Sequence, residues 1–318
     1  DRAWTTPVTF VASINCARYC GADIDFVDID PRTYNISIPR LEAKLETAEA
    51  DGALPKVVIV VHLAGHPCDM AAVRALANRY GFKVIEDASH GVGGRYRNTS
   101  IGSCHYSDIT VFSFHPVKII TTGEGGVALT NDAHLAERMR LFNSHGVTRD
   151  PSLLSKEPDG PWYYEQLELG YNYRMTDIHA ALGLSQLDRL DQYSAKRHEL
   201  AHRYDELLSG LPLVTPWRDS RDYSGFHLYI IRLKLDKCAV SHREAFEKLR
   251  AAGILVNLHY IPIYRQPDFG QFGFDPADFP EAEKYYSEAM SIPLYPLLTQ
   301  DKQDEVVDAI ARTISSAQ

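Results

Sequence analysis

A nearly continuous apolar run, KVVIVVHLAG at residues 56–65, predicts a buried β-strand because it is rich in β-branched side chains. The next segment, DMAAVRALANRYG at residues 69–81, carries apolar side chains at helical spacing and ends at Gly81, which is typical of an amphipathic helix. FKVIEDAS at residues 82–89 predicts a second strand. A strand, a helix and a strand in this order predict a βαβ unit over residues 56–89 and therefore a parallel sheet.

The rest of the chain also alternates between strand and helix patterns. Val111, Phe112 and Phe114 predict another buried strand, which should end at Pro116 because proline cannot donate to a β-ladder. Further patterns predict a loop at 148–168, a long helix at 174–210, a strand at 226–235, a helix at 241–253 that opens with the Ser241/Glu244 capping-box spacing, and a final helix at 299–314.

These elements predict an α/β protein with a large, mostly parallel α/β domain and a smaller C-terminal α+β domain. At 318 residues the chain is long enough for one large core and a second, smaller one. A change of domain is expected near residue 193. We therefore assign residues 1–193 to the large domain and residues 194–318 to the small domain.

Composition narrows the range of partners and locations. The net charge of −9 and the absence of a basic run argue against a nucleic-acid partner. Five widely spaced cysteines argue against a disulfide framework and for a reducing compartment. No apolar run is long enough to cross a bilayer. We expect a cytoplasmic protein that binds neither nucleic acid nor membranes.

Unusual polar residues follow two of the predicted strands. VIEDASH carries Asp87 and His90, and VFSFHPVK carries Ser113 and Lys118. Ligands of open α/β sheets bind beyond the carboxyl ends of the strands. A lysine, an acid and a hydroxyl donor at neighbouring strand ends suit pyridoxal phosphate, because lysine forms the Schiff base and the acid keeps the pyridine nitrogen protonated.

Four longer segments support this interpretation: TPVTFVAS, VIEDASHGVGG, SFHPVKIITTGEGG and GYNYRMTDIHAALGLSQL. They resemble the successive motifs of the DegT/StrS-type sugar-nucleotide aminotransferases, which are fold type I enzymes that use pyridoxal 5'-phosphate. Within that family, HPVK followed by TTGEGG, together with NLHYIPIYRQP, most resembles the UDP-4-amino-4,6-dideoxy-N-acetyl-β-L-altrosamine transaminases of pseudaminic acid biosynthesis. The resemblance implies that L-glutamate donates an amino group to the 4-keto group of a UDP-linked deoxysugar.

The resemblance also implies roles for individual residues. Lys118 binds the cofactor covalently and later moves the proton between the amino-acid carbon and the cofactor. Asp87 pairs with the pyridinium nitrogen, and His90 lies near the phenolic oxygen of the cofactor. Ser113 binds the phosphate group. From the residues alone, Ser113 also fits an inward strand position and Asp87 a turn or helix cap.

Two further cofactor contacts are implied at more distant positions. Phe10 stacks on the ring, and Asn172 reaches the phosphate of the neighbouring subunit, so the active unit is a homodimer with shared sites. From the residues alone, Phe10 also fits the core and Asn172 a turn. His259 is as suited to a structural role as to a substrate contact. The candidate substrate contacts are His259, Tyr260, Arg265, Tyr163 and Tyr164.

The residues also allow three other interpretations. His62, His66 and Cys68 in HLAGHPCD are possible zinc ligands, but no fourth ligand is evident nearby, so we expect no metal. The GEGG glycines lack the spacing of nucleotide-binding phosphate loops. A third alternative is a cofactor-binding sensor or inactive subunit. Related sugar dehydratases have histidine in place of the lysine, so Lys118 favours transamination.

The start of the chain raises a separate expectation. It opens DRAWTTPVTFVAS without an initiator methionine, close to what the resemblance marks as an internal motif. In that family a strand and a helix with backbone donors for the cofactor phosphate precede this motif. We expect the chain to be a fragment that lacks this segment.

Overall fold

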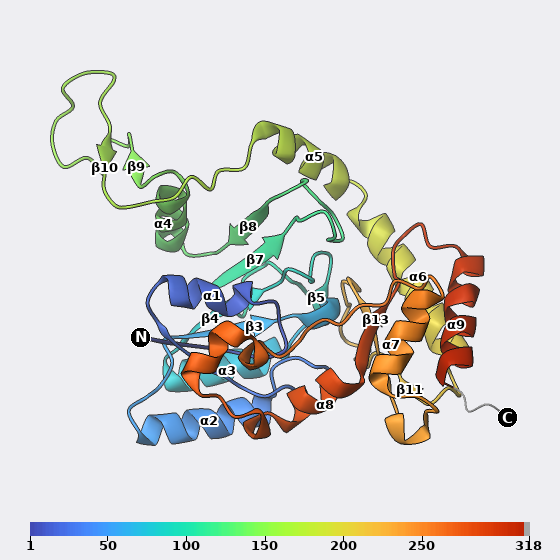
Figure 1. Ribbon diagram of the computed structural model, residues 1–318. Helices are drawn as coiled ribbons and strands as arrows, with labels where there is room; N and C mark the ends of the chain where they lie inside the picture. Colours follow the sequence, from blue (N-terminus) through green and yellow to red (C-terminus); the bar gives the residue numbers. More distant parts are fainter. Residues whose placement is uncertain (315–318) are drawn as a thin grey trace.

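The computed structural model describes residues 1–314, and within them six strands form one central sheet. These strands are Arg2–Thr5 (β1), Asp23–Phe26 (β2), Val57–Val61 (β3), Lys83–Asp87 (β4), Ile109–Ser113 (β7) and Gly126–Leu129 (β8). Their order across the sheet is β2-β1-β3-β4-β7-β8 (Figure 1). All neighbouring pairs are parallel except β7 and β8. The expected α/β fold with a mostly parallel sheet is confirmed.

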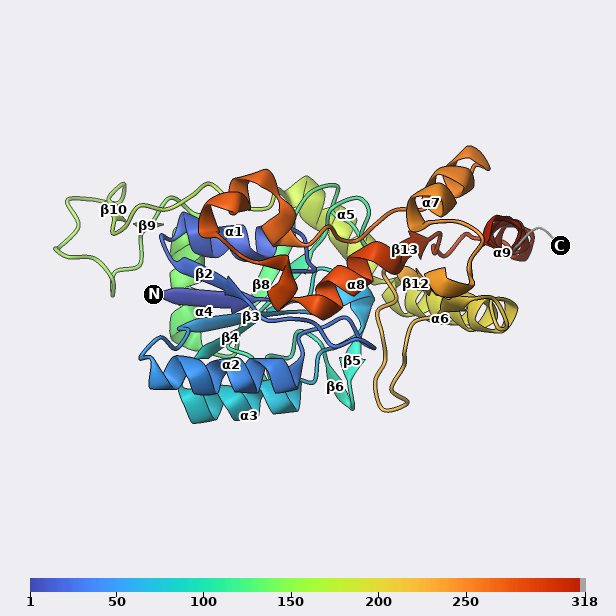
Figure 2. The same ribbon diagram turned by 60° about the horizontal axis from the view of Figure 1, so that its bottom comes forward.

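Helices cover both faces of this sheet. One face carries α1 (Ala12–Tyr19), and the other carries α2 (Ile38–Ala50) and α3 (Met70–Tyr80), as Figure 2 shows. Apolar side chains that alternate along β3 and β4, such as Val58 and Val84, are fully buried against α2 and α3. Burial on both faces explains why β3, with the sequence VVIVV, is apolar throughout.

The predicted βαβ unit consists of β3, α3 and β4, and its helix boundaries are those that the sequence indicates. Asp69 precedes α3, and its side chain accepts a hydrogen bond from the backbone N–H of Ala72. Gly81 ends α3 with a φ of 79°, a left-handed conformation that favours glycine.

The predicted strand around Phe112 ends earlier than expected. We expected it to continue to Pro116, but β7 ends at Ser113. The chain then turns, and the backbone N–H of Lys118 donates to the carbonyl oxygen of His115 at 2.9 Å. Lys118 therefore lies on a turn five residues beyond the end of the strand.

The single long helix predicted over residues 174–210 is wrong. The structure contains two helices, α5 (Asp177–Leu187) and α6 (Leu190–Leu207). Arg189, between them, has φ −104° and ψ −1° and interrupts the regular helix. No glycine or proline marks this interruption, so the hydrophobic pattern alone gave no sign of it.

An extended loop projects from the body of the protein near α4 (Ala133–Asn143). Two short strands, Val147–Thr148 (β9) and Glu165–Gln166 (β10), pair antiparallel at its base (Figure 1). The expected loop at 148–168 thus corresponds to this projection. We refer to residues 149–164 as the projecting loop.

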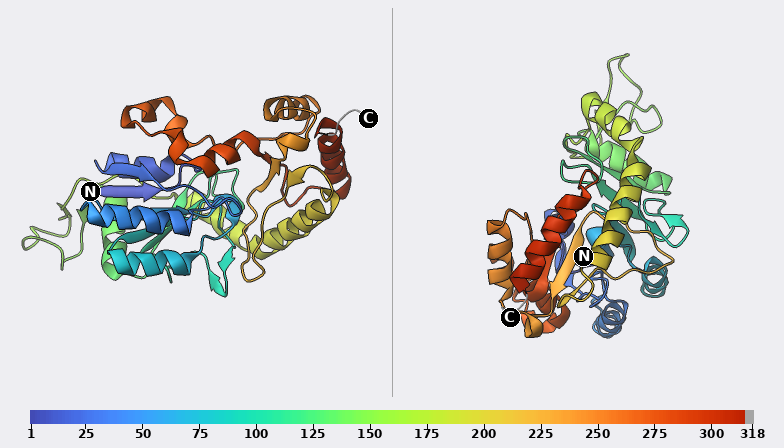
Figure 3. Two further views of the ribbon diagram at one scale, coloured as in Figure 1. Left: turned by 90° about the horizontal axis from the view of Figure 1, so that it is seen from below. Right: turned by 90° about the vertical axis from the view of Figure 1, so that its right-hand side faces the viewer.

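The C-terminal part has its own sheet (Figure 3). It also has its own apolar core. The Ser241/Glu244 capping box is confirmed. The strands of the C-terminal part are Leu213–Val214 (β11), Tyr229–Leu233 (β12) and Ala289–Ile292 (β13). Its helices are His242–Ala251 (α7), Pro280–Glu288 (α8) and Gln300–Ile314 (α9). The remaining short elements are the β5–β6 hairpin (Arg95–Tyr96 and Thr99–Ser100) and 3-10 turns at Leu63–Gly65, Leu235–Lys237, Ile263–Arg265, Pro267–Phe272 and Pro276–Asp278.

Part of the C-terminal half returns to the central sheet. Residues 263–285 pack against α1 and β2 in one shared apolar core. The carboxylate of Asp28 accepts hydrogen bonds of 3.0 Å from the backbone N–H groups of Glu281 and Ala282, at the start of α8. The domain boundary near residue 193 stays a prediction.

The sequence predicts neither a membrane span nor a disulfide framework. Over residues 1–314, no helix has both the length and the apolar character that a membrane span requires. All five cysteines are free thiols.

Candidate active site

A cavity of about 640 Å³ opens at the carboxyl ends of β4 and β7. Five of the predicted cofactor-binding residues line it: Lys118, Asp87, His90, Ser113 and Phe10. The volume lies within the range of about 300–1,000 Å³ that is usual for small-molecule sites. The fold therefore brings together residues that are up to 108 positions apart in the sequence. They meet at the carboxyl ends of the strands, where a ligand was expected.

Lys118 is half-buried at this cavity. Burial lowers the pKa of its ammonium group, because the charged form loses solvation, and the negative charge of Asp87 opposes that shift. Asp87 acts on Lys118 by charge alone, since no hydrogen bond joins the two side chains among the described residues. Lys118 thus has more of the neutral amine than an exposed lysine has.

The carboxylate of Asp87 is held by two serines. The Ser13 hydroxyl donates to Oδ2 at 2.6 Å, and the Ser89 hydroxyl and backbone N–H donate to Oδ1 at 2.6 and 3.1 Å. Sequence reasoning missed both residues. The Asp-x-Ser spacing of Asp87 and Ser89 is a known local turn signal, whereas Ser13 lies 74 positions away on α1 and gave no signal.

His90 is buried and donates toward the cavity. Its Nδ1 accepts a hydrogen bond of 3.2 Å from the backbone N–H of Ala64, so the neutral ring carries its proton on Nε2. Nε2 lies 3.2 Å from the hydroxyl of Tyr260. Burial, and then the charges of Lys118 and His259, hold the pKa of His90 well below its usual value.

His227 is a second buried histidine that sequence reasoning missed. Its ring centre lies 4.4 Å from that of His90, and its Nδ1 has no hydrogen-bond partner within the described chain. Arg197 of α6 donates to the carbonyl oxygen of His227 at 3.3 Å. FHLYIIRLKL has the composition of a buried strand, and nothing in that pattern marks its histidine as a functional residue.

Two glycines allow the backbone to approach His90 closely. Gly65 has a φ of 100°, and a Cβ at this position would lie 2.8 Å from the carbonyl oxygen of His90 and 2.7 Å from the backbone nitrogen of Phe226. A Cβ on Gly225 would lie 2.9 Å from the same carbonyl oxygen. Both positions therefore require glycine, and together they fix the backbone of His90.

His259, Tyr260 and Phe10 form the opposite wall. Nδ1 of His259 lies 2.8 Å from the hydroxyl of Ser291, and burial lowers the pKa of His259 to about 4. Burial and the charge of Asp87 raise the pKa of Tyr260. Phe10 is 59% exposed and lies 6.1 Å from the ring of Tyr260, so it belongs to the cavity wall rather than the core.

The other candidate residues lie outside this cavity. Arg265 binds Glu283 through Nε at 2.8 Å, and its guanidinium group is thereby committed to that carboxylate. Tyr163 lies in the projecting loop and donates to Glu165, and Tyr164 belongs to the same loop. Asn172 is exposed. None of these four residues lines the cavity that contains Lys118.

The zinc interpretation does not fit the structure. Nε2 of His62 lies 2.8 Å from a carboxylate oxygen of Glu86, and Nδ1 accepts a hydrogen bond from the backbone N–H of Cys68. Both ring nitrogens are therefore engaged. Residues 1–314 contain no group of three or more side chains placed to hold a metal ion.

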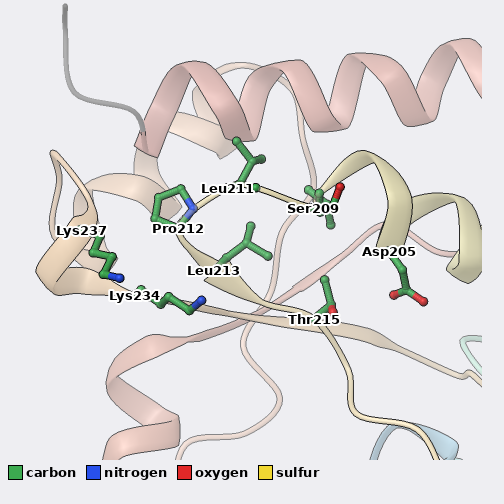
Figure 4. A pocket seen from close by; sticks show the side chains of 10 residues that line it. Asp205, Ser209, Leu211, Pro212, Leu213, Thr215, Lys234 and Lys237 are labelled. Carbon is green, nitrogen blue, oxygen red and sulfur yellow. The ribbon is translucent and has the colours of Figure 1, made fainter.

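A second hollow, of about 700 Å³, lies in the C-terminal part (Figure 4). It is lined by Asp205, Lys234 and Lys237 among others, and by none of the predicted site residues. The carboxylate of Asp205 accepts a hydrogen bond from Tyr229 and pairs with Arg218. Its charge is therefore already satisfied within the protein, and this hollow lacks the chemistry found around Lys118.

The donor set around Lys118 fits pyridoxal phosphate. The cavity offers an amine with a lowered pKa, a carboxylate held in place by hydrogen bonds, and a neutral histidine that donates through Nε2. These are the groups needed to bind the aldehyde, the pyridine nitrogen and the phenolic oxygen of the cofactor. Lys118, Asp87 and His90 would hold these three groups.

Comparison with known proteins agrees with this chemistry. The DegT/DnrJ/EryC1/StrS aminotransferase family model matches residues 1–311. The spore coat polysaccharide biosynthesis protein SpsC of Bacillus subtilis is 37% identical, with 100% of this chain and 80% of SpsC covered.

Solved structures give the same result. Helicobacter pylori PseC, an aminotransferase involved in the biosynthesis of pseudoaminic acid, superposes with a TM-score of 0.87 at 31% identity, covering 98% of this chain and 79% of that chain. The sugar aminotransferase Spr1654 of Streptococcus pneumoniae, in its PMP form, gives a TM-score of 0.86 at 27% identity and covers 98% and 81%. The protein belongs to the DegT/DnrJ/EryC1/StrS aminotransferase family, whose members depend on pyridoxal phosphate.

Proposed function

We propose that this aminotransferase moves the amino group of L-glutamate to the 4-keto group of a UDP-linked 6-deoxy amino sugar. The observation that carries the proposal is the placement of Lys118, Asp87 and His90 around one cavity. The similarity to PseC and to a polysaccharide biosynthesis protein supports a sugar substrate. The five free thiols support a reducing, cytoplasmic location.

Lys118 is proposed to act twice. When bound, the cofactor accepts the amino group and withdraws electrons from the carbon that loses its proton. The neutral amine of Lys118 is the form that adds to an aldehyde, and burial makes that form more accessible. Freed by the amino donor, Nζ of Lys118 would remove the proton from the α-carbon of the donor and would deliver it to the cofactor carbon to which Lys118 had been bound.

The neighbouring residues bind and orient. The Asp87 carboxylate would bind the pyridine nitrogen and stabilise its positive charge, which matters most as negative charge develops during proton removal. Nε2–H of His90 would donate to the phenolic oxygen. Ser113 would bind the phosphate, and Phe10 would cover one face of the ring. An Asp87→Asn variant keeps the shape of the side chain and removes its charge, so turnover should fall by about 10²–10³-fold.

A homodimer is proposed because one helix has an unburied apolar surface. The helix α5 has no buried residue in the single chain, although most of its side chains are apolar. Its exposed apolar side chains are Ile178, Leu182, Leu184 and Leu187. A surface of this kind on a two-fold axis suits a second copy of the chain. Asn172, just before α5, would then reach the site of the partner.

Mixing two inactive variants tests the shared site. In a heterodimer of Lys118→Ala and Asn172→Ala chains, one site combines the intact lysine with the intact asparagine of the other chain. Random pairing of equal amounts, after dissociation and reassociation, should therefore restore about a quarter of wild-type activity. If Asn172 acts within its own chain, the mixture stays inactive and the proposal of shared sites is wrong.

The reaction itself is tested by the two half-reactions. L-Glutamate should abolish the visible absorbance of the bound cofactor, and a keto acceptor should restore it. A panel of UDP-linked 4-keto sugars of different configuration then identifies the acceptor, and TDP- and GDP-linked analogues serve as controls. Absorbance that L-glutamate leaves unchanged would instead indicate a cofactor-binding protein without transaminase activity.

A further inference from the structure

The hydrogen bonds that reach Asp87 form a directed chain. Oγ of Ser13 lies 2.6 Å from Oδ2 of Asp87, and Oγ1 of Thr9 lies 2.7 Å from Oγ of Ser13. An ionised carboxylate only accepts hydrogen bonds, so the single hydroxyl proton of Ser13 is directed to Asp87. Thr9 must then be the donor to Ser13. The series of hydrogen bonds therefore runs from Thr9 through Ser13 to Asp87.

This chain is shielded from water. Thr9 and Ser13 are 3% and 5% exposed. In such surroundings, hydrogen bonds polarise one another, and a bond to an ionised acceptor is stronger than one between neutral groups. The two hydroxyls lie four positions apart, on the chain that leads into α1 and on its first turn. The first turn of α1 thus places the Ser13 hydroxyl at the carboxylate, and Thr9, which precedes the helix, supports that hydroxyl.

The carboxylate has a competing partner. Lys118 lines the same cavity and is attracted to Asp87, yet the two make no hydrogen bond in the described residues. An ion pair between them would hold Lys118 in its charged form and would turn the carboxylate away from the cofactor ring. Ser13 and Ser89 each bind one oxygen of the carboxylate and so oppose this rotation.

We propose that Ser13, supported by Thr9, is a positioning residue that holds the Asp87 carboxylate toward the cofactor ring and apart from Lys118. The inference rests on the role given to Asp87 in the proposed function. Ser13 itself touches neither substrate nor cofactor in this role. It acts only through the orientation of the carboxylate.

The test uses the holoenzyme and the variants Ser13→Ala, Ser13→Thr and Thr9→Val. Ser13→Ala removes one hydrogen bond to a charged group, so the affinity for pyridoxal phosphate should fall about tenfold. The pH midpoint of the visible absorbance of the bound cofactor should rise, because the released carboxylate stabilises the protonated nitrogen of Lys118. Ser13→Thr keeps the hydroxyl and should restore both values. Thr9→Val should have a smaller effect of the same sign.

A purely structural role gives a different pattern. It would lower the thermal midpoint of the cofactor-free protein and leave the pH midpoint of the holoenzyme unchanged, and that result overturns the proposal. If Ser13→Ala does not fold, Thr9→Val still decides, because a wild-type pH midpoint in that variant also overturns the proposal.

An Asp87→Asn variant separates the two levels of inference. If Asp87→Asn loses turnover and cofactor affinity while Ser13→Ala keeps the wild-type cofactor affinity and pH midpoint, only the role of Ser13 is wrong. If Asp87→Asn itself retains wild-type turnover and cofactor affinity, the role of Asp87 in the proposed function is wrong, and the role of Ser13 falls with it.

Discussion

The imidazole rings of His90 and His227 lie 4.4 Å apart, with both side chains buried beside the active-site cavity. Two positive charges cannot be accommodated at this distance away from water. Burial holds the pKa of each ring well below its usual value, and His90, Lys118 and Arg197 further oppose protonation of His227. The pair therefore stays neutral in the folded enzyme.

This neutrality makes stability depend on pH. Each histidine titrates near pH 6.5 when unfolded, so below that pH the unfolded chain binds more protons than the folded one, and stability falls as the pH falls. At pH 5.5 each ring that stays neutral in the folded protein lowers the free energy of unfolding by about 1.4 kcal/mol. The loss of unfolding free energy between pH 7.5 and pH 5.5 should be smaller in His227→Gln than in the wild type. His134→Gln, at an exposed position of α4, is the control. An unchanged pH dependence in His227→Gln would contradict the neutral pair.

Replacement of Lys118 should abolish covalent cofactor binding. In Lys118→Ala, borohydride reduction of the holoprotein should leave no cofactor on the protein, whereas in the wild type peptide mapping should locate it on Lys118. Turnover should be lost while the fold is retained, because the half-buried amine makes no hydrogen bond to Asp87. Lys302→Ala, at an exposed position of α9, should behave like the wild type. Labelling of any other lysine would refute the assignment.

The apolar surface of α5 predicts a separate mutational effect. Leu184 is 68% exposed in the single chain, and Leu184→Asp would place a charge in the proposed interface. Light scattering should show a shift from dimer to monomer, with loss of activity because Asn172 no longer reaches the other site. Leu297 is 88% exposed in the C-terminal part, and Leu297→Asp should remain dimeric. A dimeric, active Leu184→Asp enzyme would place the interface elsewhere.

A matched pair of glycines tests the packing behind His90. Gly65 and Gly210 have similar positive φ angles, 100° and 89°, but only at Gly65 would a Cβ meet backbone atoms closer than 3 Å. Both changes to alanine carry the conformational strain, so their difference isolates the clash. Gly65→Ala should lower the free energy of unfolding by about 1–3 kcal/mol more than Gly210→Ala does, measured by urea denaturation. Equal losses of unfolding free energy would show that the backbone of His90 can shift to accommodate the added Cβ.

The sequence predicted those parts of the fold that depend on local pattern. The strand, helix and strand at residues 56–89 are correct because apolar periodicity, the Asp69 cap and Gly81 all act within a few residues. The break at Arg189 was missed because no local residue signals it. A turn of ordinary backbone conformation between two helices depends on what each helix packs against.

The candidate site divides in the same way. Lys118 and Asp87 were recognised because they carry the chemistry of a cofactor site at or just beyond the ends of two predicted strands, whereas Ser13 was not, since a serine on a helix has many ordinary explanations. Its contact with Asp87 depends on how α1 packs on the sheet. His227 was missed because the apolar strand pattern around it gives no sign of a functional side chain.

The capping of α8 by Asp28 joins the beginning of the chain to its last quarter. Together with the apolar core that residues 263–285 share with α1 and β2, it holds the two halves together independently of the peptide bonds between them. A protease that cuts the projecting loop would therefore produce two fragments that stay associated and migrate as one particle under native conditions. Only a denaturing gel would reveal the cut, and the halves made as separate polypeptides would have the contacts needed to reassemble.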